Sequence, residues 1–142
     1  RQGLDAQLVK MIEHAEQVTA ANTSMRLQIA FNYGAREEIA EAAARLAVRV
    51  AKGELDAANI TPDQVDAELS TQGLPDPDLV IRTSGENRLS NFLLWQCAYS
   101  EFYFTDVLWP DFDAANLHAA LQAFNRRERR FGRVEPALSK TD

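Results

Sequence analysis

The most informative part of this sequence is Leu79-Val-Ile-Arg-Thr-Ser-Gly-Glu-Asn-Arg-Leu-Ser-Asn-Phe-Leu-Leu-Trp-Gln-Cys-Ala-Tyr-Ser-Glu101. It begins with a short apolar run after Pro77 and Asp78, which is the pattern of a buried strand. A polar loop then extends to Ser90, and a second apolar run predicts a helix over about Asn91–Ala98. A strand, a cation-rich loop and a helix start in this order predict an anion-binding site.

The loop supplies the groups that such a site needs. Arg82 and Arg88 carry planar guanidinium groups that fit phosphate oxygens, and the start of the next helix offers unpaired backbone N–H groups. Ser90 either caps that helix or donates to phosphate. The alternative is that Arg82 pairs with Glu86 or an aspartate, Arg88 is solvated and Ser90 is only a cap. The first hypothesis is a diphosphate pocket.

Glu101 lies at the far end of the predicted helix. A carboxylate there could hold Mg²⁺ against the same anion, because Mg²⁺ takes one or two carboxylates together with phosphate oxygens and water. A lone carboxylate before an apolar strand is otherwise a solvated or ion-paired group.

The remaining sequence alternates helical and extended patterns. Helices are predicted over about Leu4–Ala21, Arg36–Lys52, a short segment that begins at the capping box Thr61-Pro62-Asp63-Gln64, and Ala114–Arg130. Gly53 is expected to stop the second helix, and Asp113 can cap the last. Strands are predicted over Met25–Phe31, Leu79–Arg82 and Phe102–Thr105. The expected buried stripes are Leu8, Met11, Ile12, Ala15 and Val18 in the first helix, Ile39, Ala43, Leu46 and Val50 in the second, and Leu117, Ala120, Leu121 and Phe124 in the last. This alternation predicts an α/β fold: a partial open, mainly parallel β-sheet flanked by helices.

Ligands of open α/β sheets bind beyond the carboxyl ends of the strands. Two polar turns fall at such ends, Asn32–Arg36 and Thr83–Ser90, so we expect both to line one crevice. The basic run Arg126–Arg130 is most simply a solvated helix end, and its functional alternative is a clamp on an anionic substrate.

Bulk properties exclude several classes of protein. The 142 residues suit one domain, with 46% apolar and 25% charged residues, as in globular proteins. A net charge of −6 argues against general nucleic-acid binding. Cys97 is the single cysteine, so no internal disulfide can form, which fits a reducing cytoplasm, and we expect a buried, inert thiol. No apolar run approaches the roughly 20 residues of a membrane span, and no signal peptide is visible.

Five segments resemble the C-terminal half of the cis-prenyltransferase family, in particular bacterial undecaprenyl pyrophosphate synthases. They are Asn32-Tyr-Gly-Ala-Arg36, the long block Asp78–Gln96, Tyr99-Ser-Glu-Phe-Tyr-Phe104, Trp109-Pro-Asp-Phe112 and Arg127-Glu-Arg-Arg-Phe-Gly132. The resemblance extends from the first helix to Gly132, with the motifs in the family's order. It implies that residues 1–142 are the C-terminal part of a single cis-prenyltransferase domain whose N-terminal part is absent; the start at Arg1 in a helical pattern fits this expectation.

The resemblance also implies an activity. Family members are homodimeric transferases that add isopentenyl diphosphate units to farnesyl diphosphate with cis double bonds. The bacterial product, undecaprenyl diphosphate, is the lipid carrier for cell-wall peptidoglycan synthesis. A cytoplasmic enzyme is therefore expected, with peripheral membrane contact through its lipid product.

Site residues follow from the resemblance position by position. Arg82, Arg88 and Ser90 match the residues that hold isopentenyl diphosphate, and Leu89 adds backbone contact. Glu101 matches the carboxylate ligand of Mg²⁺. Arg130-Phe131-Gly132 resembles the Arg-x-Gly motif, which reaches into the partner subunit's site.

Two departures from the family pattern accompany these matches. Asn87 stands where the family commonly has a metal-associated His, and its amide can still offer an oxygen ligand. The family's Asp-Gly-Asn-Gly-Arg loop, with its catalytic Asp, does not occur in this sequence, so no catalytic residue is predicted here. Two alternatives remain: a catalytically silent partner subunit of a prenyltransferase dimer, and a generic phosphate-ligand-binding domain.

Overall fold

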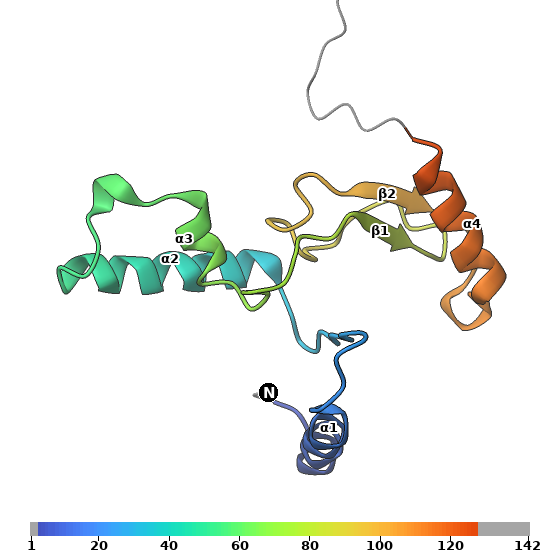
Figure 1. Ribbon diagram of the computed structural model, residues 1–142, viewed down its shortest axis with the longest axis horizontal. Helices are drawn as coiled ribbons and strands as arrows, with labels where there is room; N and C mark the ends of the chain where they lie inside the picture. The colour runs from blue at the N-terminus through green and yellow to red at the C-terminus, as the bar shows by residue number, and fades with distance from the viewer. Residues whose placement is uncertain (1–2, 128–142) are drawn as a thin grey trace, which may run out of the picture. The chain divides into compact units, whose positions relative to one another are not determined.

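The computed structural model describes residues 3–127, which fall into two compact units on either side of the Gln72–Gly73 bond. Figure 1 shows the elements of both units in chain order. The first unit is helical, and the second contains the sheet.

The first unit contains α1 (Ala6–Thr19), α2 (Ala35–Ala51), the 3₁₀ turn η1 (Ala57–Asn59) and α3 (Pro62–Asp66). These helices confirm the predicted ones within a few residues. The capping box predicted at the start of α3 is present: the Thr61 backbone N–H donates to Gln64 Oε1 over 3.1 Å, and the Thr61 side chain accepts from the Gln64 backbone.

Gly53 ends α2 as its sequence position predicts. Its φ of 73° is left-handed, and its N–H donates to the Val50 carbonyl while the Glu54 N–H reaches back to Arg49. This pair of bonds is a Schellman motif, which satisfies carbonyls that the helix end would leave unpaired.

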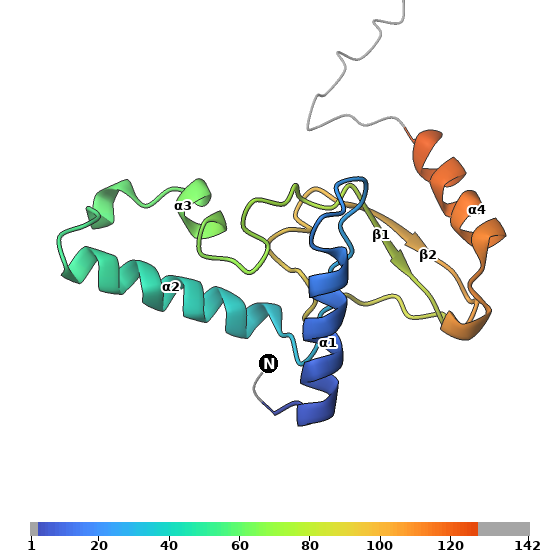
Figure 2. The ribbon, with the colours of Figure 1, turned by 60° about the horizontal axis from the view of Figure 1, so that its bottom comes forward.

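α2 packs against α3, and both views show the two side by side (Figures 1 and 2). The buried face differs from the predicted one, because Ala43 is exposed and Ile39 and Val50 are only half-buried. The buried residues of α2 are Ala35, Glu38, Ala42 and Leu46. The apolar pattern alone could not predict this face, because the face includes the Glu38 carboxylate. Hydrogen bonds to this carboxylate offset the free-energy cost of burying it.

None of the α1 residues is buried, so the predicted stripe of this helix, including Met11 and Val18, does not form a core. The predicted strand Met25–Phe31 is also wrong: no strand is assigned there, and Met25, Leu27, Ile29 and Phe31 are 49–79% exposed. A strand needs a neighbour to pair its backbone groups, and residues 3–127 provide none for this segment.

The second unit contains β1 (Leu79–Arg82), β2 (Glu101–Phe104), the 3₁₀ turn η2 (Trp109–Asp111) and α4 (Ala114–Asn125). β1 and β2 are parallel, with Leu79 opposite Glu101 and Arg82 opposite Phe104. This confirms the parallel sheet, although β2 begins one residue before its predicted start and the described residues contain two strands, not three.

α4 contacts β2, and its Ala120 is fully buried. Leu117 and Leu121, from the predicted core face, stay partly exposed. The helix ends at Asn125 with Arg126 as its cap, earlier than the predicted Arg130, which lies beyond the described residues.

The helix predicted over Asn91–Ala98 is wrong. Ser90, Asn91 and Leu93 have φ values of 55°, 60° and 46°, and a left-handed backbone cannot continue a right-handed helix. Successive turns replace the helix. In one of them, the Cys97 N–H donates to the Leu93 carbonyl over 2.9 Å. The expected helix N-terminus beside the loop is therefore missing from this segment.

Within residues 3–127, no helix combines the length and the apolar character that crossing a bilayer requires.

Candidate functional site

The loop after β1 is fixed by backbone bonds that continue the pairing with β2. Thr105 N–H donates to the Arg82 carbonyl, Gly85 N–H to Thr105, and Ser84 N–H to Val107, over 3.0, 3.0 and 2.8 Å. Ser84 and Gly85 both have left-handed φ values, 65° and 67°. The loop is thus a defined turn whose position the sheet determines.

Arg82 and Ser90 lie together at the two ends of this loop. Arg82 Nη2 is 3.4 Å from Ser90 Oγ. Arg82 Nε is buried and has no hydrogen-bond partner within residues 3–127, and the same part of the chain supplies Arg82 with no ion pair. The predicted alternative, in which Arg82 pairs with Glu86 or an aspartate, is not found there. A cation with a spare buried donor is suited to an anionic ligand.

Arg88 has a different environment. Its Nη2 lies 2.7 Å from Glu86 Oε2, and its side chain is 72% exposed. The pair is close but poorly aligned for a hydrogen bond, since the same Glu86 oxygen is buried without a hydrogen-bond partner among the described residues. Arg88 is therefore ion-paired with Glu86 and not simply solvated. The two residues beside Arg88 differ in exposure: Leu89 is half-buried, and Asn87 is exposed.

Glu101 is the first residue of β2. Its Oε2 lies 2.6 Å from Nη1 of Arg127, a residue that follows α4. Over residues 3–127, no group of three or more His, Cys, Asp or Glu side chains could hold a metal ion by itself. One carboxylate still fits a Mg²⁺ ion that takes most of its ligands from phosphate and water. Glu101 can serve in this way through Oε2 only if Arg127 releases that oxygen.

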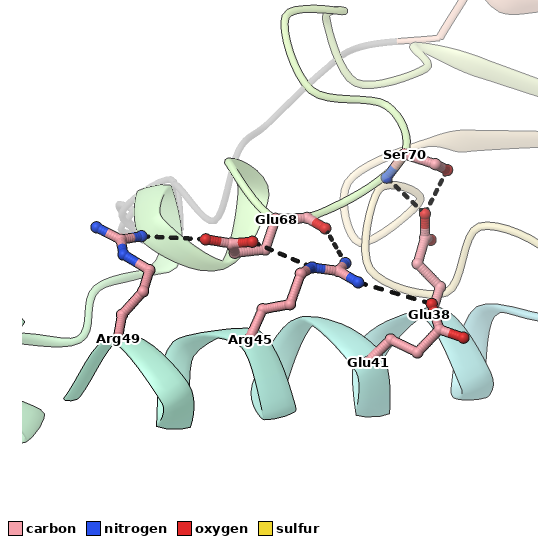
Figure 3. A network of polar contacts seen from close by, with 6 residues as sticks. All are labelled: Glu38, Glu41, Arg45, Arg49, Glu68 and Ser70. Carbon is pink, nitrogen blue, oxygen red and sulfur yellow. Dashed lines mark hydrogen bonds and ion pairs between the residues drawn. The ribbon is translucent and has the colours of Figure 1, made fainter. Parts of the chain in front are cut away.

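The Asn32–Arg36 turn belongs to the first unit and precedes α2. Tyr33 Oη donates to Glu38 Oε2 over 2.6 Å, and the Ser70 backbone N–H donates to Oε1 of the same carboxylate over 2.8 Å. The Ser70 hydroxyl also hydrogen-bonds to that oxygen (Figure 3). A buried carboxylate with three donors is well satisfied, so Glu38 links the turn to the segment after α3. That this turn and the Thr83–Ser90 loop share one crevice stays a prediction.

Two arginines extend this polar network along α2. Arg45 Nε and Arg49 Nη1 each lie 3.1 Å from a carboxylate oxygen of Glu68, and Arg45 also donates to the Glu68 carbonyl (Figure 3). Their partner Glu68 lies just after α3, so ion pairs join α2 to the segment that follows α3, in addition to the packing of the two helices.

Cys97 is buried, as predicted. Burial raises the pKa of its thiol, although a hydrogen bond with Ser100 acts in the opposite direction. A raised pKa leaves less thiolate at neutral pH, which is consistent with an inert cysteine.

Arg130 and Gly132, the predicted Arg-x-Gly residues, lie outside the described residues. Two features were not predicted from the sequence: the hydrogen bonds around Glu38 and the Arg127–Glu101 ion pair. Glu38 lies three residues from Ala35 and four from Ala42, a spacing that could have placed it on the buried face. No sequence signal pairs Arg127 with Glu101, because 26 residues separate them.

This chain resembles known isoprenyl transferases. A sequence model of the undecaprenyl diphosphate synthase family of prenyltransferases matches residues 1–132. An isoprenyl transferase of Agrobacterium fabrum is 55% identical over 93% of this chain and 53% of its own length. The ditrans,polycis-undecaprenyl-diphosphate synthase ((2E,6E)-farnesyl-diphosphate specific) of Escherichia coli is 50% identical over 93% of this chain and 52% of its own length.

Two solved structures have the same fold. Lavandulyl diphosphate synthase from Lavandula x intermedia, in complex with dimethylallyl diphosphate, gives a TM-score of 0.88 at 43% identity over 92% of this chain and 56% of that one. A probable undecaprenyl diphosphate synthase from Campylobacter jejuni gives 0.74 at 33% identity, covering 92% of this chain and 59% of that one. The chain therefore spans about half the length of the curated relatives that it matches.

Proposed function

Because this chain belongs to the undecaprenyl diphosphate synthase family of cis-prenyltransferases, we propose that it forms the isopentenyl diphosphate side of such an enzyme's active site. The complete protein would condense isopentenyl diphosphate units onto farnesyl diphosphate to give undecaprenyl diphosphate. The Escherichia coli relative supports this choice, since its name specifies farnesyl diphosphate and the undecaprenyl product.

The pair of Arg82 and Ser90 carries this proposal. Arg82 ends β1, its Nε is buried without a partner among residues 3–127, and Ser90 Oγ lies 3.4 Å from its Nη2. A guanidinium and a hydroxyl at the carboxyl end of a strand present several donors to one phosphate group. Arg88 would add a second cation after it exchanges Glu86 for the ligand, with Leu89 contributing backbone contact.

In the proposed reaction, the alkene of isopentenyl diphosphate attacks the allylic carbon, and the allylic diphosphate departs. The isopentenyl unit then loses a proton, which forms the new cis double bond. Arg82, Arg88 and Ser90 would hold the isopentenyl diphosphate so that its alkene faces the allylic substrate, which lowers the entropic cost of the reaction. Mg²⁺ would help stabilise charge on the diphosphate groups, with Glu101 as its carboxylate ligand and Asn87 as a second oxygen donor.

Three further features belong to the same proposal. The enzyme would be a homodimer in which Arg130–Gly132 reaches the partner's site. It would work in the cytoplasm, and it would touch the membrane through its lipid product. The silent-subunit alternative is disfavoured, because a silent subunit need not keep all four of the residues Arg82, Arg88, Ser90 and Glu101.

Steady-state kinetics of the full-length protein test the proposal. Arg82→Ala and Arg88→Ala should each raise the KM for isopentenyl diphosphate about tenfold or more, or reduce kcat, because each removes charge-assisted hydrogen bonds of ~1.5–3 kcal/mol. Arg26→Ala, which removes an exposed arginine from the first unit, is the matched control. Unchanged kinetics in both site variants would refute the assignment. Comparing farnesyl with dimethylallyl diphosphate as the second substrate tests the choice of allylic partner.

A further inference from the structure

The carboxylate assigned to Mg²⁺ already has a cationic partner within its own chain. Glu101 Oε2 and Arg127 Nη1 are 2.6 Å apart, and the two side chains are 32% and 40% exposed. No other hydrogen bond or ion pair of Glu101's side chain occurs within residues 3–127. Arg127 thus occupies one of the two carboxylate oxygens that a divalent cation could use.

We infer that Arg127 controls the access of divalent cations to Glu101. In the absence of metal and diphosphate, the guanidinium neutralises the carboxylate. When the metal binds together with a diphosphate, the guanidinium leaves. This inference rests on the proposed function, since it takes Glu101 as the metal ligand.

Repulsion between the two cations makes them compete for Glu101. A guanidinium and a divalent ion on one carboxylate would repel strongly at a separation of a few ångströms, whereas either alone neutralises the oxygen that it contacts. An exposed ion pair also contributes little free energy, so a bound cation can displace Arg127.

The fold keeps Arg127 beside Glu101 while leaving its side chain able to move. The Arg127 backbone N–H donates to the Phe124 carbonyl over 3.2 Å, and α4 contacts β2 with Ala120 fully buried. The backbone at the end of α4 is therefore set relative to the first residue of β2. The guanidinium is partly exposed, so its movement needs no rearrangement of the helix.

Binding of Mn²⁺ to the full-length protein, followed by electron paramagnetic resonance of the free ion, tests this inference. The titration contains saturating isopentenyl diphosphate and no allylic diphosphate, so no turnover occurs. Arg127→Gln should tighten Mn²⁺ binding about fivefold, the upper range for releasing an exposed ion pair. Arg127→Lys retains the cation and should stay within about twofold of the wild type.

Arg126→Gln is the matched control, because it removes the same charge one residue away and Arg126 has no ion pair within residues 3–127. It should change Mn²⁺ affinity by less than about twofold. Equal tightening by Arg126→Gln and Arg127→Gln would overturn the inference, because a general charge effect would then explain both. Thermal unfolding of every variant checks that the fold is kept.

Glu101→Gln separates this inference from the proposed function. It should weaken Mn²⁺ binding, and Arg127→Gln should give no tightening in that background. If Glu101→Gln weakens binding but Arg127→Gln alone has no effect, the role of Arg127 is wrong and the metal ligand stands. If Glu101→Gln has no effect, the metal assignment fails and the inference fails with it.

Discussion

At the scale of single residues, Glu38 is the clearest example of a charge that the fold requires. It is 8% exposed, and its oxygens accept from the Tyr33 hydroxyl and from the backbone and hydroxyl of Ser70. Removing a shared acceptor leaves several donors unsatisfied, which costs far more than losing one exposed contact.

Glu38→Ala should therefore lower the free energy of unfolding by about 2–3 kcal/mol in chemical denaturation of the full-length protein. Glu41→Ala is the control on the same helix: it removes an exposed carboxylate with an i,i+4 ion pair to Arg45 and should change the free energy of unfolding by about 0.5 kcal/mol or less. Similar losses in both variants would show that the network around Glu38 contributes little.

At the scale of elements, the loop after β1 depends on Gly85. Its φ is +67°, and a Cβ added there would lie 3.2 Å from Asp106 Oδ1. Gly85→Ala should destabilise the loop by ~1–2 kcal/mol from backbone strain and raise the KM for isopentenyl diphosphate by displacing Arg82 and Ser90.

Gly73→Ala is its control, because Gly73 has a φ of +77° with no atom within 4 Å of an added Cβ. The strain is comparable and the loop is untouched, so stability should fall while the KM stays close to that of the wild type. A KM effect of equal size in both variants would contradict the role assigned to the loop.

The start of α4 gives a prediction for pH. Asp113 caps this helix by accepting from the Asn116 backbone N–H over 3.0 Å, and these hydrogen bonds lower the pKa of its carboxyl. Because the folded pKa lies below the unfolded one, the cap contributes its full stability above the ordinary aspartate pKa of about 3.9 and loses it as pH falls through the lower, folded value.

Asp113→Asn retains the capping oxygen but cannot titrate. Its melting temperature should depend less on pH below about pH 4 than that of the wild type. Melting curves between pH 2.5 and 6 measure this difference, and identical pH profiles for the two proteins would contradict it.

At the scale of the whole molecule, the 142 residues should show negligible prenyl transfer by themselves. They span about half the length of the curated relatives, and they lack the Asp-Gly-Asn-Gly-Arg loop that the family resemblance associates with catalysis. A prenyl-transfer assay of this chain beside the full-length protein checks the expectation. Turnover by the 142 residues alone would refute it.

The sequence by itself determined the features that depend on neighbouring residues. The caps at Thr61 and Asp113, the stop at Gly53 and the strand at Leu79–Arg82 were all predicted, because their hydrogen bonds and backbone angles are set within a few positions. The family was recognised for a similar reason, since its motifs are contiguous runs.

Only the tertiary structure decided the features that need distant partners. Met25–Phe31 has a strand pattern but no paired neighbour among residues 3–127, and Asn91–Ala98 contains left-handed residues that its apolar pattern does not signal. The partners of Glu38 and Glu101 are 32 and 26 residues away. Pairing across such distances depends on how elements pack, and local sequence carries no information about it.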